Sequence, residues 1–202
     1  MNRIIWLLIL SDILILSAFG LIGPIFAIFL DTGITGGSIT AAGIASSVFF
    51  IVKSITQLPL SKMLDNRKDK LTFLIVGTFL IVVVPFIYVL APNVNYIYIA
   101  EGIYGLGAAM SYPAWFTLFT NHLDKKHQGW EWSVWGTGTG VGAAITAYLG
   151  AILAKNFGFN FVFYAVGAVS FIGMMLLFFL SKKYLKDVKK IEHFLRLDHL
   201  KR

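Results

Sequence analysis

The chain has 202 residues, of which 57% are hydrophobic and only 13% are charged, with a formal net charge of +7 and no cysteine. Soluble domains carry about 25% charged residues, so this composition excludes an ordinary soluble domain and predicts an all-α membrane protein with several spans. The absence of cysteine excludes disulfides, thiolate metal sites and cysteine nucleophiles.

Six stretches of the sequence are apolar and long enough to cross a bilayer, which takes about 20 residues in a helix. They are residues 3–30, 39–60, 71–91, 96–120, 134–154 and 161–181. The first runs past Asp12, whereas the apolar part of a signal peptide is about 7–15 residues long, so we expect it to be retained as a span. Residues 1–181 are therefore predicted to form one transmembrane bundle.

The basic residues predict how the bundle is oriented. Of the 17 Lys and Arg residues, all except Lys53 and Lys155 lie at the start of the chain, in the second and fourth loops, or after residue 181. Loops rich in Lys and Arg face the cytoplasm. We therefore expect a plasma (inner) membrane protein with both termini in the cytoplasm, whose partner is the lipid bilayer and not nucleic acid.

An acid and a proline in the first span, Asp12 and Pro24, recur at the same spacing in the fourth span as Glu101 and Pro113. The shift of 89 residues that takes Asp12 to Glu101 also places the second span on the fifth and the third on the sixth. Because each copy holds an odd number of spans, the second copy must enter the membrane from the opposite side. The sequence thus predicts six transmembrane helices built as two inverted three-helix repeats. The predicted repeats cover residues 3–91 and 92–180.

Three ionisable residues lie inside the predicted spans: Asp12, Lys53 and Glu101. A charge at mid-helix costs about 2.5–3.5 kcal/mol on insertion scales, so these side chains should face a cavity or one another. Asp12 and Lys53 lie at matching depth, about 13 Å from the cytoplasmic ends of their spans, which predicts an ion pair between them. From the sequence, a structural pair and a pair linked to transport look the same.

Glu101 lies about 9 Å below the outer end of its span and has no obvious cationic partner. Burial without a counter-charge favours a protonated carboxyl, so Glu101 is the first candidate for a proton-carrying group; the alternative is a neutral or water-exposed acid at the outer mouth. The same helix face carries small residues and then aromatic ones, which predicts a ligand-sized hollow. We expect Tyr104, Tyr112 and Trp115 to line it.

The fifth predicted span contains a run of glycines, and three tryptophans lie on both sides of its start. The glycines are Gly136, Gly138, Gly140 and Gly142. They predict a smooth face that lets a neighbouring helix approach closely, and a dinucleotide-binding loop is discarded because its third glycine is missing. Trp130, Trp132 and Trp135 are expected to anchor the helix at the headgroups, with ligand stacking as the alternative.

After residue 181 the sequence becomes strongly basic. Residues 182–202 are predicted to form a cytoplasmic amphipathic basic helix on the membrane surface, with a connector or partner-contacting helix as the alternative. The four histidines lie outside the spans, and neither a serine–histidine pair on facing spans nor a cluster of metal ligands is predicted. We therefore expect no enzyme activity, no metal and no cofactor.

The loop after the second span resembles a motif of the major facilitator superfamily. The family's pattern is G-x-x-x-D-R-x-G-R-[RK], and here the loop runs from Ser61, in place of the glycine, through Asp65 to Lys70, with these last two positions matching. The resemblance implies that Asp65, Arg67 and Lys70 form a cytoplasmic gate loop. A solvated basic loop that only sets orientation is the alternative.

The fourth span resembles the family pattern R-x-x-Q-G-x-G-x-A, with Gly105 and Gly107 kept, Glu101 in place of the arginine and Tyr104 in place of the glutamine. The resemblance covers about residues 3–181 and is to the amino-terminal six-span half. It implies a half-size secondary active transporter that moves a small solute by alternating access, with the proton as one candidate coupling ion. The alternative is a non-transporting scaffold or accessory subunit of the same fold.

In this family the solute lies between two six-span halves, so one half supplies only half of a cavity. The resemblance therefore implies that a homodimer, or a separately encoded second half, completes the pathway. A truncated remnant is the alternative.

Overall fold

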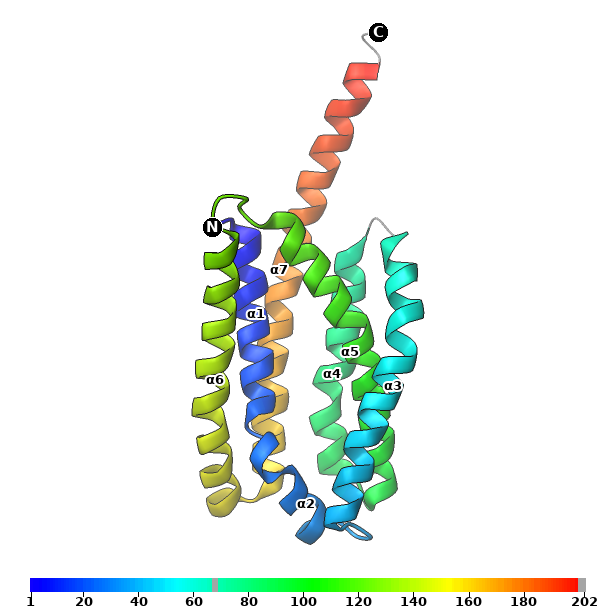
Figure 1. The fold of residues 1–202 in the computed structure, drawn as a ribbon, viewed down its shortest axis with the longest axis vertical. Coiled ribbons are helices and arrows are strands. Elements are labelled where there is room, and N and C mark those ends of the chain that lie inside the picture. Colours follow the sequence, from blue (N-terminus) through cyan, green and yellow to red (C-terminus); the bar gives the residue numbers. More distant parts are fainter. Residues whose placement is uncertain (67–68, 200–202) are drawn as a thin grey trace.

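The computed structural model describes residues 1–66 and 69–199, with side chains described as far as residue 180. The helices over these residues, shown in Figure 1, are α1 (Arg3–Gly20), the 3-10 turn η1 (Gly23–Ile25), α2 (Phe26–Thr32), α3 (Ile39–Asp65), α4 (Lys70–Leu90), α5 (Val94–His122), α6 (Gln128–Phe157) and α7 (Phe159–His199). The backbone of the predicted basic helix continues α7 as far as His199. Its side chains, and Arg67, lie outside the described residues.

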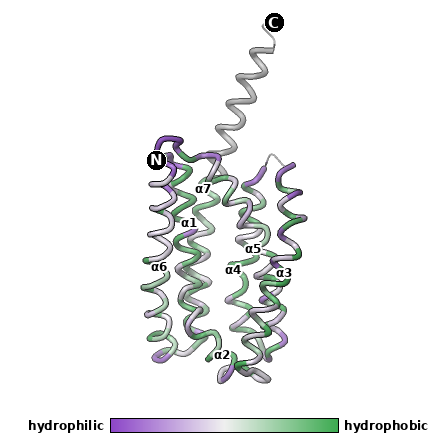
Figure 2. Tube along the Cα trace, in the orientation of Figure 1, coloured by the Kyte–Doolittle hydropathy of each residue, from purple (hydrophilic) through white to green (hydrophobic). Residues whose placement is uncertain are grey.

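Five helices of the described residues are long and apolar enough to cross a membrane. They are Arg3–Thr32, Ile39–Asp65, Lys70–Leu90, Gln128–Phe157 and Phe159–Leu180. The remaining predicted span, the fourth (96–120), lies in α5, which is also long at 29 residues, but its polar residues and glycines lower its hydropathy. Figure 2 shows hydrophobic residues along the helices and hydrophilic residues gathered at the ends. We call the end that carries the N-terminus the N-terminal end and the opposite one the α2 end.

The first predicted span, 3–30, is interrupted near its proline. α1 ends at Gly20, and the chain passes through η1, which contains Pro24, before α2 begins. Proline removes a backbone donor and glycine costs helix stability, so the neighbouring Gly23 and Pro24 favour the break. Pro113, the counterpart of Pro24, lies within an unbroken α5 and has no adjacent glycine.

The helices pack as two groups that meet along α4 and α7. α1 contacts α6 and α7, α5 contacts α3 and α4, and α4 contacts α7. Glycines allow the closest of these approaches: a Cβ at Gly105 of α5 would collide with the Phe49 carbonyl of α3. Likewise a Cβ at Gly77 of α4 would collide with the Gly107 carbonyl of α5. Because no side chain separates the backbones at these points, the helices pack closely.

The predicted glycine face of α6 divides between two environments. A Cβ at Gly142 would collide with Ser17 of α1, and a Cβ at Gly138 would collide with an isoleucine of α1. Gly136 and Gly140 face open space, since no atom lies within 4 Å of a Cβ built on either. The four glycines therefore do not act as one face: two of them admit α1, and two do not.

Two clusters of buried side chains fill the interior, one toward each end of the bundle. The cluster at the N-terminal end includes Ile5, Leu8, Trp115, Phe119 and Leu177, and the cluster at the α2 end includes Phe29, Tyr88, Ile97, Phe163 and Val166. The outer faces of α3 and α6 are apolar as well: Leu58 is 78% exposed and Tyr148 is 71% exposed. Such faces suit lipid or another apolar protein surface.

Candidate functional site

Two hollows lie between the helix groups, and each contains one of the acids that the sequence places inside a span. The first, which we call the Asp12 pocket, has a volume of about 60 Å³ and is lined from α1, α3, α4, α5, α6 and α7. The second, the Glu101 hollow, has a volume of about 300 Å³ and is lined from α1 to α5. The structure thus places both acids beside internal space.

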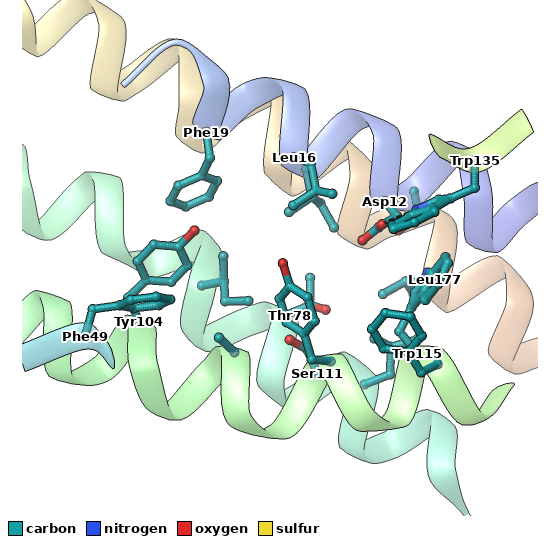
Figure 3. A pocket seen from close by; sticks show the side chains of 17 residues that line it. Asp12, Leu16, Phe19, Phe49, Thr78, Tyr104, Ser111, Trp115, Trp135 and Leu177 are labelled. Carbon is teal, nitrogen blue, oxygen red and sulfur yellow. Dashed lines mark hydrogen bonds between the residues drawn. The ribbon is translucent and has the colours of Figure 1, made fainter. Parts of the chain in front are cut away.

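Asp12 is half-buried on α1 and bonds to α6. Its Oδ2 accepts a hydrogen bond of 2.6 Å from Trp135 Nε1, and Figure 3 shows the two side chains together at one end of the pocket. The Trp115 ring packs 5.2 Å from the Trp135 ring, and Trp115 Nε1 donates to the Leu8 carbonyl at 3.3 Å. The carboxyl is therefore held by a positioned neutral donor, without an opposing charge.

Lys53 does not pair with Asp12, so the predicted ion pair is wrong. The Lys53 ammonium lies 4.5 Å from the ring centroid of Tyr112 and 5.8 Å from that of Phe49. α3, which carries Lys53, packs on α5, whereas Asp12 faces α6. The matching positions along the sequence indicate how deep the two side chains lie in the bundle. They do not indicate the direction in which each side chain points.

Glu101 is 5% exposed on α5 and bonds to α4. Its Oε1 accepts a hydrogen bond of 2.5 Å from the Tyr88 hydroxyl, which is itself buried. In the described part of the chain no group donates to Glu101 Oε2. Like Asp12, this acid has one neutral donor and no basic partner among the described residues.

An aromatic layer separates the two hollows. It consists of Phe19, Phe49 and Tyr104, which line both of them. The Tyr104 ring stacks on Phe19 at 4.9 Å with 26° between the planes, and lies 4.6 Å from Phe49. In Figure 3 these three side chains meet at the end of the Asp12 pocket opposite Trp135. The hollows therefore share one wall of rings.

The aromatic residues expected to line a hollow all border the Asp12 pocket. Tyr112 and Trp115 line only this pocket, and Tyr104 lines both hollows. Tyr112 is 38% exposed, whereas Trp115 is buried at 5%. The face of α5 that begins at Glu101 thus leads from the Glu101 hollow through the aromatic layer to the Asp12 pocket.

The predicted gate loop lies at the N-terminal end, between α3 and α4. Asp65 is the last residue of α3 and is exposed, and Lys70 is the first residue of α4. Asp69 caps α4 by accepting a 3.0 Å hydrogen bond from the Thr72 amide. Arg67 lies outside the described residues. The loop is thus anchored on its α4 side by a local cap.

Trp132 and Trp135 belong to an internal ring cluster, in contrast to the predicted headgroup anchors. Trp132 lies 6.3 Å and Trp135 lies 5.2 Å from the Trp115 ring. Trp130 is 69% exposed, as an anchor would be. The sequence did not identify the donor to Asp12, and it did not identify Tyr88 because a tyrosine within an apolar span is a weak signal.

A further acid, Glu131, is buried in the first turn of α6 with 1% exposure. Its Oε2 accepts a 3.0 Å hydrogen bond from the Asp124 amide, and its Oε1 lies 3.9 Å from the Met1 amino group. The sequence assigned Glu131 to a cytoplasmic loop. Its position between Trp130 and Trp132 was the one signal that could have revealed it.

These features, long apolar helices packed around internal hollows that are lined by acids, define an integral membrane protein with the arrangement of a transporter bundle. The chain belongs to the major facilitator superfamily, because the model of that family matches residues 7–199.

Named relatives and a solved structure agree with this membership. The chain is 25% identical over 179 residues to multidrug resistance protein MdtG of Enterobacter lignolyticus, covering 87% of this chain and 42% of the relative. It is 27% identical over 135 residues to the proton-coupled antiporter flippase LtaA of Staphylococcus haemolyticus, covering 65% and 32%. A crystal structure of the POT family transporter PepTSo matches with a TM-score of 0.77 at 16% identity, covering 90% of this chain and 38% of that one, and shows a shared fold. The chain spans less than half the length of each of these three proteins.

Proposed function

We propose that this chain is a six-helix half of a secondary active transporter that moves a small solute across the plasma (inner) membrane by alternating access, with both termini in the cytoplasm. The observation that carries the proposal is the pair of hollows, each lined by one acid, on the two sides of one aromatic layer. Alternating access needs internal space that opens to each side in turn, with a barrier between. The names of the two relatives, a drug resistance protein and an antiporter flippase, point the same way.

The packing supports two inverted three-helix repeats. Exchanging α1 with α5, α3 with α6 and α4 with α7 turns the α1–α6 contact into α5–α3 and the α1–α7 contact into α5–α4, and leaves α4–α7 in place. The register agrees as well. Phe49 and Lys53 of α3 lie against Gly105 of α5, and the shift of 89 residues takes these two α3 positions to Gly138 and Gly142 of α6. The latter two lie against α1, the counterpart of α5.

Asp12 and Glu101 are the groups that we assign to proton coupling. Each accepts one hydrogen bond from a neutral donor, Trp135 or Tyr88. A carboxyl held in this way takes up and releases a proton without breaking an ion pair. Lys53 stays beside the Asp12 pocket, over the Tyr112 ring, as a fixed positive charge of the pathway. The relative described as a proton-coupled antiporter supports this choice of ion.

A second six-helix unit completes the pathway in this proposal, either as a homodimer or as a separately encoded half. The Glu101 hollow is walled on one side by exposed residues such as Ser46 and Phe50, the latter 60% exposed. A second unit would cover them. The gate loop with Asp65, Arg67 and Lys70 would meet that unit on the cytoplasmic side.

The test is proton-linked solute flux in proteoliposomes that contain the full chain. A pH-sensitive dye trapped inside reports proton movement when a panel of solutes is added outside. We expect a solute-dependent proton flux that falls at least about tenfold in Asp12→Asn and in Glu101→Gln, because each removes a titratable site. Asp31→Asn, which changes an exposed acid of α2, serves as the matched control and should keep the flux.

Two outcomes would overturn the proposal. Unchanged flux in both Asp12→Asn and Glu101→Gln removes the assigned coupling roles. A folded, correctly reconstituted protein that moves no solute of the panel, alone or crosslinked as a dimer, favours a scaffold of the same fold instead.

A further inference from the structure

We propose that the Glu101 hollow binds a hydrophobic organic cation, with Glu101 as its counter-charge and the surrounding rings as its walls. The inference rests on the proposed function, because it names the class of solute that the transporter carries. It concerns binding at equilibrium, however, so it can be tested without any flux.

The charge of the hollow is that of a single acid. Glu101 is the one acidic residue among those that line it in the described structure, and none of them is basic. The Tyr88 hydroxyl donates to Oε1 at 2.5 Å, while Oε2 accepts no hydrogen bond from the described residues. A neutral hydroxyl stabilises a carboxylate without cancelling its charge, so the ionised hollow carries a negative charge that a cationic ligand would balance.

Aromatic rings make up most of the walls. The rings are those of Phe19, Phe26, Phe49, Phe50, Tyr88 and Tyr104. They come from α1, α2, α3, α4 and α5 and support one another: Phe26 lies 5.8 Å from Tyr88, and Phe49 lies 5.0 Å from Phe50. The face of an aromatic ring attracts a cation within about 6 Å of its centroid, most strongly where water is excluded. The walls thus suit an apolar ligand that carries positive charge.

One ring of the hollow, Phe49, together with the neighbouring Tyr112, already contacts a cation in this protein. Lys53 Nζ lies 4.5 Å from the Tyr112 centroid and 5.8 Å from the Phe49 centroid, and no carboxylate lies within ion-pair distance of it in the described residues. Phe49 also lines the Glu101 hollow. Ring faces alone therefore accommodate an ammonium at this level of the bundle, and the hollow adds the carboxylate that Lys53 lacks.

The size and the available ligands favour an organic cation over a metal ion or a zwitterion. Calcium takes about six to eight oxygen ligands, whereas the hollow offers one carboxylate and a few hydroxyl groups. A zwitterion would bring a negative group that needs a basic partner, and the lining contains none. The volume of about 300 Å³ lies at the lower end of the range of ligand pockets.

The experiment is equilibrium binding of radiolabelled tetraphenylphosphonium to the full chain in lipid nanodiscs, with binding to empty nanodiscs subtracted. Tetraphenylborate, which has the same shape and the opposite charge, is the matched ligand. We expect saturable binding of the cation only. Glu101→Gln should weaken this binding at least about tenfold, and Phe19→Leu, which removes a ring but keeps bulk, about threefold. Asp31→Asn, at an exposed acid of α2, should leave it unchanged.

The inference is overturned if the wild-type chain shows no saturable binding of the cation, if the anion binds equally well, or if Glu101→Gln keeps the wild-type affinity. Should Glu101→Gln fail to fold, as judged by circular dichroism, the comparison of the two ligands and the Phe19→Leu variant decide in its place. Cation binding without any proton-linked flux would keep this inference and remove the proposed transport. Proton-linked flux without cation binding would keep the proposed transport and remove this inference.

Discussion

The Asp12 pocket and the Glu101 hollow occupy equivalent places in the two proposed repeats, yet their acids are held by different helices. Asp12 of α1 accepts its hydrogen bond from Trp135 of α6, whereas Glu101 of α5 accepts its own from Tyr88 of α4. The shift of 89 residues takes Tyr88 to Leu177, which lines the Asp12 pocket without donating anything. In the proposed repeat, the two acids therefore keep equivalent positions, whereas their hydrogen-bond donors differ.

The two sites also differ in how closed they are around the acid. Asp12 is half-buried beside a pocket of about 60 Å³ and Glu101 lies beside a hollow of about 300 Å³, and both volumes exceed the roughly 10–15 Å³ that a water molecule needs. Glu101 is 5% exposed, and the buried Tyr88 hydroxyl is its one donor within the described residues. Because more of the Asp12 side chain is exposed, water can replace its hydrogen-bond donor more easily than that of Glu101. The comparison predicts unequal responses to equivalent changes.

The largest effect should come from breaking the α1–α6 crossing, which holds Trp135 over Asp12. Gly142→Leu places a side chain where even a Cβ would collide with Ser17 of α1. We expect it to lower the free energy of unfolding by about 3 kcal/mol, since overpacking typically costs about 1–3 kcal/mol and sometimes more. Denaturant unfolding of the protein in mixed micelles, followed by circular dichroism, measures the change.

Gly140→Leu is the matched control for that variant, because a Cβ at Gly140 meets no atom within 4 Å. It should be neutral or slightly stabilising, as leucine favours a helix over glycine by up to about 1 kcal/mol. Equal losses at Gly140 and Gly142 would show that the α1–α6 contact is not where the structure places it.

A smaller and more selective effect should follow from deleting the two donors. Tyr88→Phe removes the hydroxyl that serves the buried Glu101, which should cost about 1–3 kcal/mol of unfolding free energy, the usual penalty for a buried group left without its partner. Trp135→Phe should cost less through its lost hydrogen bond, because water in the pocket can serve Asp12. Trp132→Phe, which loses the same ring volume without a bond to Asp12, corrects for packing. The loss of unfolding free energy in Trp135→Phe, after the loss in Trp132→Phe is subtracted, should be smaller than the loss in Tyr88→Phe. A larger loss would show that Asp12 is not closer to water than Glu101.

The sequence predicted the elements better than their ends. The predicted span 39–60 begins where α3 begins, but α3 continues to Asp65, because Lys62 and Asp65 end the apolar run without ending the helix. The predicted span 134–154 lies inside α6 for the same reason. The break before α2 does not appear in the hydropathy, because the apolar run 3–30 continues through it. Hydropathy indicates where the chain is apolar, whereas helix limits depend on glycine, proline and capping groups.

For the candidate site, the cost of a charge in a membrane was enough to place Asp12 and Glu101 beside internal space. It was not enough to name their partners. Trp135 and Tyr88 reach the acids through the rotation of each helix about its own axis, which depth along the sequence does not specify. The same limitation produced the wrong partner for Lys53, whose helix faces α5.

The smallest effect concerns an acid at the surface, Asp124, which contrasts with both buried acids. The amide of Lys126 and the His127 ring each contact its carboxylate at 3.0 Å, and they hold the pKa of Asp124 below its usual range. Such a group stabilises the fold above its unfolded pKa of about 3.9, and that contribution is lost as the pH falls through the folded value. Asp124→Asn should therefore flatten the acid side of the profile of melting temperature against pH.

That change should be smaller than the one from Tyr88→Phe, because solvent screens an exposed carboxylate. The Asp124 amide, which donates to the buried Glu131, stays in place in Asp124→Asn, so the turn before α6 should persist. Asp31→Asn, at another exposed acid, is the control for a general charge effect. A melting temperature that falls at neutral pH by as much as in Tyr88→Phe would mean that the exposed turn is as important to stability as the buried donor, and the contrast between surface and buried acids would not hold.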